Sequence, residues 1–93
     1  MMKLNELTIT KLMEKFNGLE TQYRYTLGRV KYFYNREEFD RIPWEKLNVL
    51  DDAMNAIIIA VTMKEDTSKR KENALNRMVE KYNALDERRA KFF

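Results

Sequence analysis

The chain has 93 residues and contains neither cysteine nor histidine, which excludes a disulfide framework, thiolate metal ligands and imidazole chemistry. A sequence of this length has room for one hydrophobic core. Its composition, with 44% apolar residues, 35% charged residues, two glycines and one proline, favours long helices. We therefore expect one all-α domain over residues 1–93, with no cofactor and no metal site.

The net charge of +3 is unevenly distributed, because residues 43–66 are mainly acidic and the flanking segments 1–42 and 67–93 are basic. This pattern predicts helices that attract one another within the fold. The longest apolar run, residues 56–61, is far shorter than the ~20 residues that a membrane-spanning helix needs. Residues 1–6 contain no apolar core of a signal peptide. We expect a cytoplasmic protein without a membrane span.

The first predicted element is a helix over residues 9–35. Its apolar positions recur at alternating spacings of three and four, with Thr26 the one polar member, which is the period of an amphipathic helix. They are Ile9, Leu12, Phe16, Leu19, Tyr23, Thr26, Val30 and Phe33. Residues 23–34 are also aromatic and β-branched enough to form a β-hairpin. A lone hairpin is marginally stable and no other strand is predicted, so the helix is favoured.

Pro43 marks the start of a second predicted helix, over residues 43–65. Large apolar residues, among them Leu47, Leu50, Met54, Ile57 and Val61, form one side of it. Smaller ones form a second side, at Val49, Ala53, Ala56, Ala60 and Met63. A helix that is apolar over most of its circumference packs on two sides. It is therefore either the central helix of a bundle or the interface of a homo-oligomer.

The third predicted helix covers residues 68–92 and carries apolar side chains at heptad spacing, interrupted by Arg89. The junction over residues 64–69 contains neither glycine nor proline, so one continuous helix across it is an alternative. That alternative would give a helical hairpin, expected to be oligomeric. Three segments of similar length with short connections favour a three-helix bundle.

A stripe of tyrosine and basic residues lies beside the apolar positions of the first helix. Its members are Arg24, Tyr25, Arg29, Lys31, Tyr32 and Arg36. Tyrosine and arginine are enriched at the hot spots of protein interfaces, and they also stack on bases and pair with phosphates. Gly28 leaves a flat area in the middle of the stripe. The alternative interpretation is that the tyrosines pack against the third helix and the basic side chains are only solvated.

A second candidate for partner binding is the C-terminal segment with Arg88, Arg89, Phe92 and Phe93. Two aromatic rings beside cations could anchor in a groove of a partner or on an anionic membrane surface. The alternative is that Phe92 covers the end of the core.

Catalysis is not expected, because neighbouring carboxylates such as Asp51 and Asp52 diverge on a helix and no nucleophile or phosphate-loop motif occurs. The sequence therefore predicts a non-catalytic binding protein that modulates or inhibits a larger protein partner, of the kind common among phage and mobile-element accessory proteins. One alternative is a nucleic-acid-binding module that uses the tyrosine and arginine stripe. A second is a structural homo-oligomer joined through the second helix.

Overall fold

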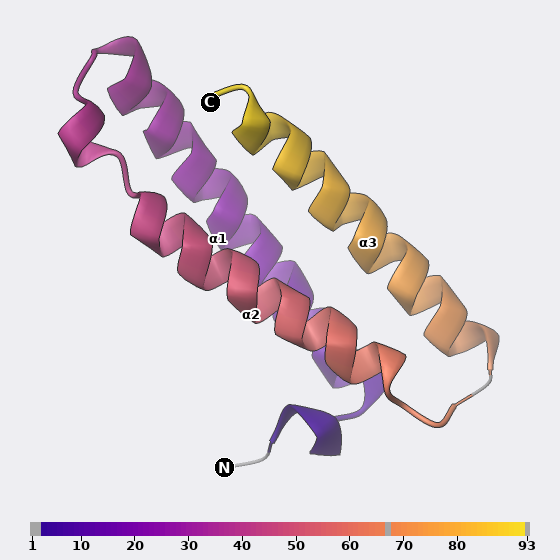
Figure 1. Ribbon diagram of the computed structural model, residues 1–93. Helices are drawn as coiled ribbons and strands as arrows, with labels where there is room; N and C mark the ends of the chain where they lie inside the picture. The colour runs from indigo at the N-terminus through magenta and orange to yellow at the C-terminus, as the bar shows by residue number, and fades with distance from the viewer. Residues whose placement is uncertain (1–2, 67, 93) are drawn as a thin grey trace.

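The computed structural model describes residues 3–66 and 68–92 of the chain. These residues form three α-helices, α1 (Ile9–Asn35), α2 (Trp44–Thr62) and α3 (Lys69–Ala90). Two 3-10 turns, η1 (Leu4–Glu6) and η2 (Phe39–Arg41), precede α1 and α2. Consecutive helices run in opposite directions along the long axis of a bundle that measures 48 × 27 × 16 Å (Figure 1). The prediction of an all-α three-helix bundle is confirmed.

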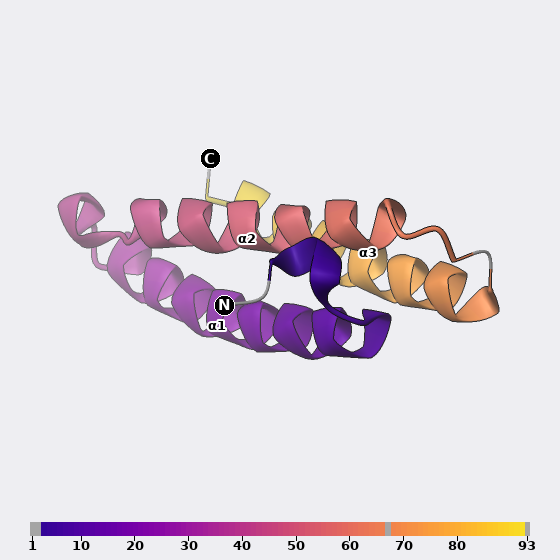
Figure 2. The ribbon, with the colours of Figure 1, turned by 90° about the horizontal axis from the view of Figure 1, so that it is seen from below.

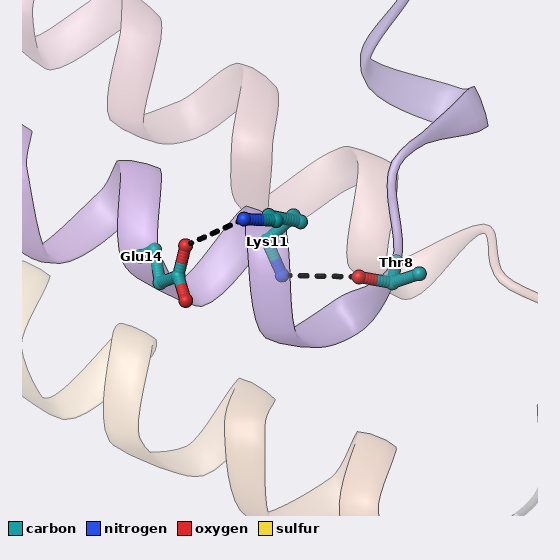
Figure 3. A network of polar contacts seen from close by, with 3 residues as sticks. All are labelled: Thr8, Lys11 and Glu14. Carbon is teal, nitrogen blue, oxygen red and sulfur yellow. Dashed lines mark hydrogen bonds and ion pairs between the residues drawn. The ribbon is translucent and has the colours of Figure 1, made fainter.

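The start of helix α1 is capped by Thr8, which precedes the apolar stripe and is not part of it. The Thr8 side-chain oxygen accepts the backbone N–H of Lys11 at 3.2 Å, and the Lys11 ammonium donates to Glu14 at 3.5 Å (Figure 3). A threonine in this position satisfies one of the free N–H groups at the start of a helix. Residues 23–34 lie inside α1, so the hairpin alternative is wrong; an apolar stripe that faces two other helices outweighs the strand propensity of its aromatic residues.

The end of α1 is closed by a reversal that uses an unusual residue. Glu37 has a φ of 58°, in the left-handed region that normally favours glycine. The N–H of Glu38 donates to the carbonyl of Phe33 at 2.9 Å, and the N–H of Glu37 donates to Tyr34 at 3.1 Å. This pair of bonds is the Schellman arrangement, which satisfies the last carbonyls of a helix. It turns the chain back towards α2.

Helices α2 and α3 are shorter than the predicted ranges 43–65 and 68–92. Pro43 lies just outside α2 as its N-cap residue, and the helix ends at Thr62. After it, the Asp66 carboxylate accepts the backbone N–H of Ser68 at 2.8 Å, just before α3 begins. That hydrogen bond lowers the pKa of Asp66. The continuous-helix alternative is therefore wrong, because α2 ends at Thr62 and a local hydrogen bond from Ser68 to the Asp66 side chain precedes α3, without glycine or proline.

One hydrophobic core runs the length of the bundle. It includes most of the predicted positions of the first helix and adds Leu27, which the stripe did not include. The side chains with 0% exposure are Leu12, Phe16, Val30, Leu47, Met54 and Val61. Buried Thr26 donates its hydroxyl to the carbonyl of Gln22 at 2.8 Å, so a polar group is accommodated in this stripe. Among the described residues no buried side-chain nitrogen or oxygen lacks a partner.

The N-terminal turn η1 lies against α1 and α2 on the side away from α3 (Figure 2). Leu4 and Leu7 are half-buried there, and the Lys64 ammonium donates to the carbonyl of Asn5 at 3.1 Å. This segment covers part of the end of the bundle at which α1 begins and α2 ends. The opposite end, where α1 and α3 both terminate, carries two surface depressions.

Candidate functional site

The predicted stripe forms an open surface on the C-terminal half of α1. Tyr25 is 67% exposed and Tyr32 is 55% exposed, so most of each side chain is in water and is not buried against α3. Their rings flank a hollow of about 420 Å³, which we call the tyrosine hollow. It is lined by Arg24, Tyr25, Gly28, Arg29, Tyr32 and Phe33.

Aromatic rings hold the cations of this surface in place. The Arg36 guanidinium lies 5.3 Å from the centre of the Tyr32 ring, and the Arg29 guanidinium lies 5.8 Å from that of Phe33. Both separations suit cation–π attraction, which contributes about 0.5–1 kcal/mol at exposed sites. The rings restrict the rotamers of these two arginines in the free chain. Less conformational entropy is therefore lost when a partner binds.

The electrostatic balance of this half of α1 is strongly positive. Residues 21–36 contain four basic side chains and no acidic one. Arg24 pairs with Glu20 at 3.6 Å and Arg36 pairs with Glu38 at 3.5 Å, at the two ends of the segment. Neither Arg29 nor Lys31 forms an ion pair with another described residue. Positive charge in the middle of the segment is therefore not compensated within the described part of the chain.

Lys31 does not line the tyrosine hollow but points to the other flank of α1. There it lines a second depression of about 380 Å³ between α1 and α3, which we call the α1–α3 groove. Its lining consists of Leu27, Gly28, Lys31, Tyr34 and Asn35 from α1 and Arg88, Lys91 and Phe92 from α3. The groove thus brings together parts of the two predicted candidate sets. Leu27, Tyr34 and Asn35 were not among the predicted residues, although Leu27, Lys31 and Tyr34 recur by four and three and could have indicated a second stripe.

Arg89, a member of the predicted C-terminal candidate, makes contacts within the bundle. Its guanidinium donates to the Asn48 side-chain oxygen at 2.6 Å and to the Tyr23 hydroxyl at 3.5 Å, and it lies 6.0 Å from the centre of the Trp44 ring. It therefore joins α3 to both other helices. Burial raises the pKa of the Tyr23 phenol, although the Arg89 cation opposes that shift. A long cationic side chain can interrupt an apolar stripe and still lie within a bundle.

The two terminal phenylalanines have different outcomes. Phe92 is half-buried against the core, and its ring lies 5.3 Å from that of Tyr34 in an edge-to-face arrangement. It covers the end of the core and at the same time forms part of the groove wall. Phe93 lies outside the described residues.

The smaller-residue side of α2 is only partly covered. Ala53 and Ala56 are half-buried and line an apolar hollow with Gly18 and Leu19 of α1. Three large apolar side chains of α2 and its C-cap remain more than half exposed, namely Val49 (61%), Ile59 (57%) and the C-cap residue Met63 (76%). Ile59 and Met63 are four residues apart and therefore neighbours on one face, whereas Val49 lies well before them. The small residues in between do not by themselves define a partner.

No cluster suited to a metal ion occurs in residues 3–66 and 68–92, where no three acidic side chains gather. The Asn55 amide donates to the Tyr82 hydroxyl at 3.1 Å, and burial together with the nearby Asp51 carboxylate raises the pKa of Tyr82. These polar groups connect α2 to α3 within the bundle and do not line either depression.

The fold and this surface define the chain as an all-α three-helix bundle with a basic, tyrosine-bearing end. No protein-family model, curated protein or solved structure matches it. None of its helices, in the part of the chain that the structure describes, is both long and apolar enough to cross a membrane.

Proposed function

We propose that this chain is a non-catalytic binding protein that contacts a larger protein through the tyrosine hollow. The observation that supports this proposal is the pair of tyrosines, Tyr25 and Tyr32, exposed by 67% and 55% on either side of a hollow with basic walls. Large aromatic side chains that remain in water in the free chain gain most when a partner covers them.

A protein partner suits this composition better than other ligands. Interface hot spots are enriched in tyrosine and arginine, and those residues cluster around depressions that a partner side chain can fill. The stacking of Arg29 on Phe33 and of Arg36 on Tyr32 holds the cations ready for carboxylates of the partner. The partner surface should accordingly be acidic, with apolar residues that fit between the two tyrosines.

The finer part of the proposal concerns what this contact does. We propose that the chain modulates or inhibits a cytoplasmic protein by covering one of its surfaces, as small accessory proteins of phages and mobile elements do. Its support is the composition alone, a single lysine-rich domain without histidine or cysteine. Loss of a partner's activity on addition of the purified chain would be the corresponding measurement.

Site-specific photo-crosslinking tests the proposed contact. A photoreactive phenylalanine analogue replaces Tyr25 or Tyr32 in turn, and Val79, which is 41% exposed on α3, serves as the control position. We expect the same protein from the source cells to crosslink from both tyrosine positions and not from position 79. Equal crosslinking from all three positions, or none from the tyrosine positions, would contradict the proposal.

A nucleic-acid-binding function is the second candidate, favoured by the four basic side chains and the absence of acidic ones over residues 21–36. If these four cations neutralised four phosphates, affinity would fall by about 50- to 150-fold between about 50 and 200 mM salt. An interface anchored by aromatic side chains should respond far less to salt. A titration with DNA and RNA at the two salt concentrations separates the two functions.

A further inference from the structure

We infer that the tyrosine hollow and the α1–α3 groove are one continuous binding site, which crosses α1 at Gly28 and takes an extended, acidic segment of a partner protein. This inference rests on the proposed function and specifies the chemistry of its partner. Its basis is that Gly28 is shared by the two depressions, whereas their other lining residues differ.

Gly28 is the point at which a partner chain can pass over the helix. It lies in the interior of α1 and is exposed, and a Cβ atom added to it would meet no atom within 4 Å. Its φ is not positive, so neither the backbone nor the packing of the fold requires glycine here. Any larger side chain would rise between the hollow and the groove and separate them.

The groove offers uncompensated positive charge above an apolar floor. Lys31 comes from α1, and Arg88 and Lys91 come from α3, so cations face the depression from two helices. No acidic residue lines either depression, and these three cations form no ion pair with other described residues. The floor includes Leu27, which is only 2% exposed.

This combination fits an acidic peptide better than a nucleic acid. Carboxylates can pair with cations at the groove walls while apolar side chains of the same segment contact Tyr34 and Phe92. A helix is roughly 10 Å across and an extended chain rises about 3.3 Å per residue, so three or four residues suffice to cross α1. The expected ligand therefore has acidic residues on both sides of a short crossing segment.

The test uses two defined probes, a random copolymer of glutamate and tyrosine and an oligothymidylate. Amide chemical shifts of the isotope-labelled chain are followed by NMR during titration with each probe. We expect the copolymer to shift residues of both depressions together, including Tyr25, Gly28, Lys31 and Arg88. Shifts confined to one depression, tighter binding of the oligothymidylate, or no binding of the copolymer would each overturn the inference.

Matched variants test the crossing point itself. Gly28→Gln should weaken copolymer binding by about tenfold or more, the effect of obstructing a hot spot, whereas Gly18→Gln should leave it unchanged. Gly18 is a suitable control because it lies in the same helix, is exposed and likewise has no atom within 4 Å of an added Cβ. Equal affinity of the two variants would overturn the crossing at Gly28.

Charge reversals separate failure of this inference from failure of the proposed function. Arg29→Glu alters only the tyrosine hollow and Arg88→Glu alters only the groove. We expect both changes to weaken copolymer binding by about tenfold, because each replaces an attraction with a repulsion. If only Arg29→Glu weakened it, the continuous site would be wrong and the proposed contact at the tyrosine hollow would stand. If crosslinking from Tyr25 and Tyr32 also failed, both would be wrong.

Discussion

Arg89 and its neighbour Arg88 provide a sharp test of how the bundle is held together. Arg89 contacts α1 and α2, whereas the exposed side chain of Arg88 forms no ion pair with a described residue. Arg89→Met keeps an unbranched apolar stem but is shorter and removes the guanidinium. Arg88→Met makes the same chemical change one position earlier. We expect only the first variant to lose stability.

The magnitude follows from the contacts. The 2.6 Å hydrogen bond from Arg89 to Asn48 has a charged donor, and such bonds contribute about 1.5–3 kcal/mol, with the lower value suited to this exposed pair. The stacking on Trp44 adds about 0.5–1 kcal/mol. At 3.5 Å the contact with the Tyr23 hydroxyl adds little. The sum of about 2 kcal/mol corresponds to a decrease in Tm of roughly 8–16 °C for a domain of this size.

Thermal and urea unfolding followed by circular dichroism measure this difference. A double-mutant cycle that combines Arg89→Met with Asn48→Ala isolates the hydrogen bond, and we expect a coupling energy of about 1–2 kcal/mol. The reasoning would be refuted if Arg89→Met were as stable as Arg88→Met. If, in addition, Arg89→Met alone weakened binding to the copolymer, the prediction that Arg89 belongs to a partner-binding surface would be supported.

Three further predictions concern other parts of the molecule. Glu37→Gly should raise the free energy of unfolding by about 1 kcal/mol in a urea titration, because it relieves the positive φ at the end of α1. Glu38→Gly should lower the free energy of unfolding in the same titration, because φ is −94° there. Burial raises the pKa of Tyr23 above 10.0, so its contribution to stability is complete below about pH 10 and is lost as the pH rises through the folded-state value. Tyr23→Phe should reduce the alkaline decrease in Tm, whereas the same change at exposed Tyr25 should not. Light scattering should give the mass of a monomer at high concentration, and a stable dimer that Ile59→Glu dissociates would instead favour the homo-oligomer.

The sequence predicted the helices well because their apolar periodicity extends over many turns. Helix α1 covers Ile9–Asn35, the predicted range, because the apolar stripe starts directly after the Thr8 cap and stops before the reversal at Glu37. The ends of α2 and α3 were less predictable. Pro43 is compatible with either a cap or a first-turn position, and the hydrogen bond of Ser68 to the Asp66 side chain is a weaker sequence signal than glycine.

The candidate site was predictable only where it lies on one helix. The stripe with Tyr25 and Tyr32 follows from spacing within α1, and exposure of both rings agrees with it. The α1–α3 groove depends on how two distant segments pack, which spacing along the chain does not reveal. The contacts of Arg89 were not predictable for the same reason, because its hydrogen-bonding partner Asn48 is 41 residues away in the sequence.

The elongated shape determines where an affinity tag or a fluorophore can be attached without covering the basic end. The described chain enters at η1, at the opposite end of the bundle from the groove, and leaves beside the groove at Phe92 (Figure 1). With a long dimension of 48 Å between these ends, an affinity tag or fluorophore joined ahead of η1 should leave the basic end accessible. One joined after α3 would crowd it, and such fusions should be avoided in binding assays.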